Sequence, residues 1–83
     1  MVQLNFYERT ILRELIKQSE NGIINRSYQQ IADEINGITF HSIRNYILRF
    51  VSYGIVSIEN KGTHRQTFRF NMELVKKLLA NDR

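Results

Sequence analysis

Residues 39–53 carry a group of polar side chains that can form specific hydrogen bonds. An arginine can bond O6 and N7 of guanine, and an asparagine can bond N6 and N7 of adenine. Arg44 and Asn45 are neighbours in this stretch, which contains no acidic residue that would repel a phosphate backbone. The residues of this stretch predicted to contact nucleic acid are Thr39, His41, Ser42, Arg44, Asn45 and Arg49.

A second candidate contact is the turn around Gly62, where Lys61, Thr63 and Arg65 lie close together in the sequence. A basic turn can follow a phosphate backbone or place an arginine in a narrow minor groove. The alternative is that these charges protect an exposed strand edge from pairing with other chains. We expect contact with DNA here, with Lys61, Thr63 and Arg65 as its residues.

The charge distribution agrees with these two candidates. The chain has a net charge of +4 and a pI of about 9.8. Residues 39–70 carry five basic residues and one acidic residue, whereas residues 1–38 carry four basic and five acidic residues. A localised basic surface is expected of a protein that binds a phosphate backbone, although a merely solvated basic surface would have the same composition.

The sequence lacks the patterns that several other classes of protein require. There is no cysteine, and the two histidines, His41 and His64, lack the spacing of a metal site. Neither a glycine-rich phosphate loop nor a nucleophile elbow occurs. We therefore expect no enzyme activity, no cofactor, no metal and no small-molecule ligand.

Length and hydropathy predict one domain over residues 1–83 in a cytoplasmic, nucleoid-associated protein. The apolar runs span only a few residues, so we expect no membrane segment. The N-terminal residues also lack the apolar core of a signal peptide.

Capping residues and apolar periodicity predict the elements that position the candidate residues. The first helix should begin at the Asn5–Glu8 capping box and stop at Gly22, with Glu8 on its polar side. The later elements are a short strand at 23–24, helices over 28–35 and 39–53, a hairpin of strands 55–59 and 64–70, and a final helix capped by Asn71.

The third of these helices should bury one face and expose the other. Ile43, Ile47 and Phe50 recur at the spacing of a single helical face. The opposite face carries His41, Asn45, Leu48, Arg49 and Ser52, with Ser42 and Arg44 at its margins. Leu48 has three open interpretations: contact with thymine methyl groups, contact with a partner or the hairpin, or simple exposure.

The chain resembles the winged helix-turn-helix family of prokaryotic and phage DNA-binding proteins over about residues 5–70. The resemblance rests on SYQQIADEINGITFHSIRNYILRF and the following VSYGIVSIE. It implies an α+β fold of three helices, a two-stranded wing and a C-terminal helix. Where the commonest spacing has a glycine this sequence has Asn36, and Gly37 follows, so the turn between the two motif helices is one residue longer.

The resemblance implies a sequence-specific regulator of transcription that binds double-stranded DNA. Its third helix would enter the major groove, and its wing would contact the backbone or the minor groove. One alternative is a winged helix that binds another protein, with Leu48, Val51 and aromatic residues as the contact surface. Another is a replication or genome-maintenance protein that binds DNA without regulating promoters.

The terminal helices together carry more apolar residues than a small core is expected to hide. We therefore expect a homodimer, whose two-fold axis would place two third helices about 34 Å apart, one turn of DNA. The alternative is that the last helix lies across the first and completes the core of a monomer. The predicted interface residues are Leu74, Val75, Leu78 and Leu79.

Overall fold

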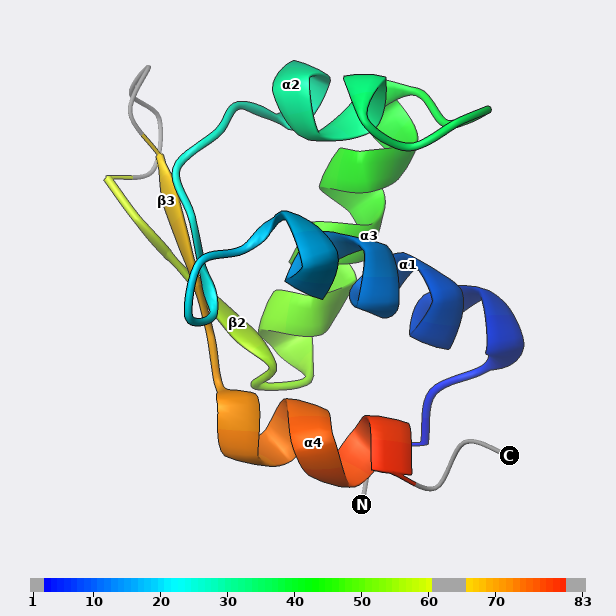
Figure 1. Cartoon of the computed structure of the whole chain (residues 1–83), viewed down its shortest axis with the longest axis vertical. Helices are drawn as coiled ribbons and strands as arrows, with labels where there is room; N and C mark the ends of the chain where they lie inside the picture. The colour runs from blue at the N-terminus through cyan, green and yellow to red at the C-terminus, as the bar shows by residue number, and fades with distance from the viewer. Residues whose placement is uncertain (1–2, 61–65, 81–83) are drawn as a thin grey trace.

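The computed structural model describes residues 3–60 and 66–80, which form four helices and a three-stranded antiparallel sheet. The elements are α1 (Phe6–Gln18), β1 (Ile23–Ile24), α2 (Tyr28–Asp33), α3 (Phe40–Ser52), β2 (Val56–Glu59), β3 (Thr67–Phe70) and α4 (Met72–Ala80). Figure 1 shows α2 at one end of the molecule and α4 at the other, with α1 and α3 between them. Among the described residues, no helix has the length and apolarity needed to cross a membrane.

Local capping starts the helices where the sequence predicts. Asn5 and Glu8 form a reciprocal capping box at the start of α1, and Ser27 and Gln30 form one at α2. The Asn71 side chain accepts a hydrogen bond from the Leu74 amide at 3.2 Å, which caps α4. Helix α2 is shorter than predicted, because the amides of Glu34 and Ile35 bond to carbonyls three residues back and tighten its end.

Gly22 does not end α1, contrary to our expectation, because that helix already stops at Gln18. Instead, Asn21 and Gly22 form a two-residue turn with φ angles of 55° and 82°. Glu20 and Ile23 exchange backbone hydrogen bonds of 2.9 and 3.1 Å across it. Two successive positive φ angles in such a turn favour an Asn-Gly pair, and the turn leads directly into β1.

We expect Gly22→Ala to destabilise the protein more than Gly54→Ala. Both glycines have positive φ, which costs about 1–2 kcal/mol for another residue. A Cβ at Gly22 would also lie 2.8 Å from Cγ of Met72, whereas at Gly54 it would enter open space. The additional loss should be about 1 kcal/mol in the free energy of unfolding, measured by urea denaturation. Equal losses would mean that Met72 moves aside without cost.

The sheet has three strands, one more than the predicted two-stranded wing, because β1 pairs with the free edge of β3. Strand β3 is therefore central and is antiparallel to both neighbours, with Ile24 and Ile58 both opposite Phe68. Phe68 and Phe70 are buried and Arg69 is exposed, as the alternation predicts. Burial of this face ties the hairpin to the helical body.

The core gathers the predicted apolar face of α3 with residues from every other element. Ile43, Ile47 and Phe50 are completely buried, as expected from their spacing. The other core residues are Leu4, Ile11, Leu12, Leu15, Ile24, Ile31, Ala32, Ile55, Val56, Phe68, Phe70 and Val75. Because one face of α3 is anchored in this way, its opposite face is held in a defined orientation.

Candidate nucleic-acid interface

The exposed face of α3 carries hydrogen-bonding side chains near the start of the helix. His41, Arg44 and Asn45 are all exposed, and Ser52 is exposed at the far end. No acidic residue occurs anywhere in the helix. The structure thus brings three of the predicted contact residues together on one face. That face presents an arginine and an asparagine, the side chains that can bond guanine and adenine respectively.

Apolar side chains interrupt this face. Leu48 is half-buried, and Val51 next to it in the following turn is 38% exposed. At the helix start, Phe40 is 39% exposed and its ring lies 4.0 Å from that of His41 between centroids. These groups can make van der Waals contact with a partner beside the polar residues.

Thr39 and Ser42 are used to begin α3. Oγ1 of Thr39 accepts a hydrogen bond from the Ser42 amide at 3.3 Å and donates one to the Ser42 hydroxyl at the same distance. Ser42 is half-buried and lies on the side of the helix toward α1. Thr39 remains exposed, but the capping role explains both side chains without a ligand.

Arg44 lies on the opposite margin of the helix, toward α2. The ring of Tyr28 on α2 packs 5.4 Å from that of Phe68, between centroids. Burial raises the pKa of the Tyr28 hydroxyl, and the nearby positive charge of Arg44 opposes that shift. Arg44 is thus close enough to α2 for its charge to act on Tyr28.

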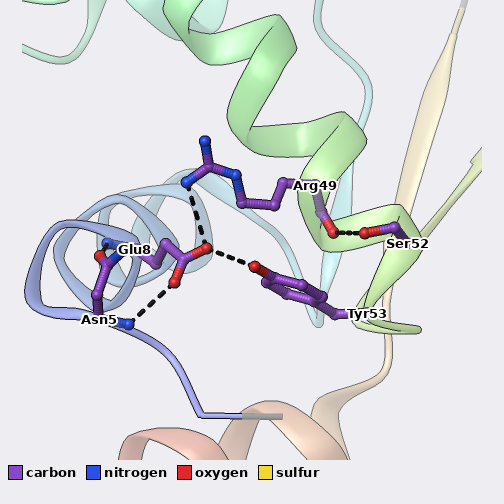
Figure 2. A network of polar contacts seen from close by, with 5 residues as sticks. All are labelled: Asn5, Glu8, Arg49, Ser52 and Tyr53. Atoms are coloured by element: carbon purple, nitrogen blue, oxygen red, sulfur yellow. Dashed lines mark hydrogen bonds and ion pairs between the residues drawn. The ribbon is translucent and has the colours of Figure 1, made fainter.

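Arg49 points back toward α1 rather than outward, as Figure 2 shows. Its guanidinium lies 3.3 Å from a Glu8 carboxylate oxygen and 5.3 Å from the centre of the Tyr46 ring. The contact of Arg49 with DNA stays a prediction, because the side chain pairs with Glu8 yet remains 45% exposed. Helical spacing alone placed it on the outer face, but its long side chain bends to a carboxylate on another helix.

Glu8 is the centre of this network and is nearly inaccessible, with its residue only 3% exposed. The Asn5 backbone amide donates to one carboxylate oxygen at 2.9 Å, and the Tyr53 hydroxyl donates to the other at 2.9 Å. The expectation that Glu8 lies on the polar side of α1 is wrong, because α3 covers it. The capping box was visible in the sequence, but no local signal links Glu8 to Tyr53.

The network holds Glu8 in its charged form. Burial alone would raise the pKa of the carboxyl, but hydrogen bonds from Asn5, Tyr53 and Arg49 outweigh it and lower the pKa below its usual value. The hydrogen bond to Glu8 raises the pKa of the Tyr53 hydroxyl, and burial raises it further. The network therefore joins the start of α1 to the end of α3 by charged hydrogen bonds.

The remaining predicted residues lie elsewhere or outside the described chain. Lys61, Thr63 and Arg65 are not among the described residues. Arg69 on β3 pairs with Glu59 across the hairpin. In α4, Val75 is only 2% exposed and belongs to the core, so it offers no surface to a second chain, whereas Leu74, Leu78 and Leu79 are half-buried.

In residues 3–60 and 66–80, no group of three or more histidine, cysteine or carboxylate side chains is arranged to hold a metal ion. No protein-family model matches this chain, and no curated protein is significantly similar to it in sequence. Its function is therefore inferred from its own residues and their geometry.

Proposed function

We propose that this protein is a winged helix-turn-helix protein that binds double-stranded DNA and regulates transcription. The observation that carries the proposal is the exposed face of α3, where His41, Arg44 and Asn45 stand together on a helix without acidic residues. Helices α2 and α3, joined by the turn at Gly37, correspond to the helix-turn-helix, and β2 and β3 correspond to the wing. In this arrangement α3 enters the major groove.

Direct contact with bases falls to Arg44 and Asn45, because their side chains have the donor and acceptor geometry to discriminate base pairs. His41 and Thr39 stand at the helix start, where contacts with phosphate are favoured. Lys61, Thr63 and Arg65 are proposed to add contacts from the wing. Their basic character supports backbone contact more than base recognition.

A second candidate function is the binding of another protein through α3. The apolar groups on its surface, Phe40 and Val51, favour this alternative. A protein partner would be expected to bury them together with Leu48, and Ala substitution of Val51 would then weaken that complex. Binding to DNA would instead depend on the polar residues of the same face.

Titration of a random-sequence duplex at several salt concentrations tests the proposal. Each phosphate neutralised releases a counterion, so log K should fall linearly with log salt, with a slope of about −0.9 per contact. From the three basic residues that the proposal names, Arg44, Lys61 and Arg65, we expect a slope of about −3. A slope near zero, or no binding at low salt, would contradict the proposed function.

The genomic positions that the protein occupies distinguish a regulator of transcription from a replication protein. Footprinting across the host genome should find occupied sites at promoters if the protein regulates transcription. Occupancy confined to a replication origin would support the replication role instead, with the same contacts between protein and DNA.

A further inference from the structure

An open groove of about 750 Å³ lies between α1, the turn that joins α2 to α3, and the first half of α3. Its apolar and aromatic lining comes from three parts of the chain: Tyr7 and Ile11 on α1, Ile35 and Ile38 in the turn, and Tyr46 on α3. Ile35, Ile38 and Tyr46 are each only partly buried. Contact with a second apolar surface would remove this remaining area from water.

The charge of the groove is opposite to that of the chain as a whole. Glu14 and Glu34 line it, and no lysine or arginine is among its described lining residues. Glu14 already pairs with Lys17 on its own helix at 3.3 Å. Within the described chain, no lysine or arginine makes an ion pair with Glu34. The groove is therefore unsuited to nucleic acid and complementary to an apolar segment that carries a positive charge.

Helix α4 of this same chain has that chemistry. Leu74, Lys77 and Leu78 are spaced at i, i+3 and i+4, so they share one flank of the helix. Both leucines are half-buried against the core of their own chain and keep part of their surface exposed, and Lys77 is exposed. Val75 points into the core and anchors the helix, which leaves this flank at the surface. No α4 residue lines the groove of its own chain.

We propose that the groove receives α4 of a second copy of the chain. Leu74 and Leu78 of one copy cover the apolar lining of the other, and Lys77 lies beside Glu34. The interaction joins two different surfaces, so it is distinct from a pairing of identical helices. It does not depend on the proposed binding to DNA, because the face of α3 that carries Arg44 and Asn45 lies outside the groove.

Charge reversal in the absence of DNA tests the proposal by sedimentation equilibrium. We expect the wild-type chain to associate in a concentration-dependent way. Glu34→Lys and Lys77→Glu should each weaken this association at least about tenfold, because each places like charges opposite one another. The double variant Glu34→Lys/Lys77→Glu should associate again. Lys76→Glu is the matched control, because Lys76 is exposed on a different flank of α4 and should have no effect.

A mixture of the two single variants distinguishes the loss of this contact from damage to the fold. The two single variants should each fail to associate alone but should associate with one another. In the mixture, the lysine introduced at position 34 of one copy faces the glutamate introduced at position 77 of the other, so opposite charges meet again. Circular dichroism should be unchanged in both variants. A wild-type monomer at all concentrations would overturn the proposal, as would single variants that associate normally.

A third result would assign the interface elsewhere. Phe6 is 65% exposed and lies outside the groove, where its ring packs edge to face on that of Tyr7, which lines the groove. Association that survives Glu34→Lys but is lost in Phe6→Ser would place the contact on Phe6, outside the groove, and overturn the α4 proposal.

Discussion

Asn45→Ala should lower the affinity for the preferred DNA site by about 5- to 150-fold, which corresponds to roughly 1–3 kcal/mol. The effect should be large because an asparagine side chain can bond adenine through both N6 and N7, and alanine replaces neither bond. Asn45 is exposed, and its side chain makes no hydrogen bond within residues 3–60 and 66–80 that the fold would lose. Affinity for random DNA should change little.

The measurement is a pair of duplex titrations for each variant at one salt concentration. One duplex contains the preferred site, and the other has a random sequence. Ser52→Ala is the matched control, because Ser52 is exposed on α3 but its hydroxyl already donates to the Arg49 carbonyl at 2.6 Å. It should leave the preference unchanged. An equal loss on both duplexes would make Asn45 a backbone contact and would leave base recognition to Arg44.

Glu8→Gln should lower the free energy of unfolding by about 2 kcal/mol at neutral pH. The carboxylate of Glu8 accepts hydrogen bonds at both oxygens, from the Asn5 amide at one and from Arg49 and Tyr53 at the other. A glutamine has one oxygen and no charge, so at least one buried donor loses its acceptor. Urea denaturation measures the loss. Glu14→Gln on the same helix should cost at most a few tenths of a kcal/mol, because its pair with Lys17 is exposed.

The same substitution predicts a dependence on pH. The pKa of Glu8 is lowered in the folded state, so its charge stabilises the fold above the pKa that it has in the unfolded chain. This contribution is lost as the pH falls toward the folded-state value. The difference in stability between the wild-type protein and Glu8→Gln should therefore be full at neutral pH and shrink in acid. A constant difference across this range would mean that the loss in Glu8→Gln does not come from the charge of the carboxylate.

A double-mutant cycle with Tyr53→Phe tests whether the network acts as a unit. Tyr53→Phe removes the 2.9 Å hydrogen bond between α1 and the end of α3, and Glu8→Gln removes the charged acceptor of that bond. The losses in the free energy of unfolding of the two single variants should therefore add up to more than the loss in the double variant. Simple additivity would mean that the residues stabilise the fold independently.

Much of the fold could be predicted because its determinants are local. The capping boxes at Asn5 and Ser27 each join residues three apart, and the buried stripe of Ile43, Ile47 and Phe50 follows from helical periodicity. The alternation of Phe68, Arg69 and Phe70 likewise predicts which side of β3 is buried. Such signals depend only on backbone geometry over a few residues, so they can be identified without knowledge of the tertiary structure.

By itself, then, the sequence determined the helix starts, the buried faces and the outward position of His41, Arg44 and Asn45. Only the tertiary structure decided that Arg49 pairs with Glu8 and that Glu8 is buried, because Glu8 lies 41 positions from Arg49 and 45 from Tyr53. It also decided that β1 joins β3 and that Ile11 meets the α2–α3 turn in a groove. Contacts of this kind depend on how whole helices and strands pack together, and a sequence pattern over a few residues does not indicate that packing.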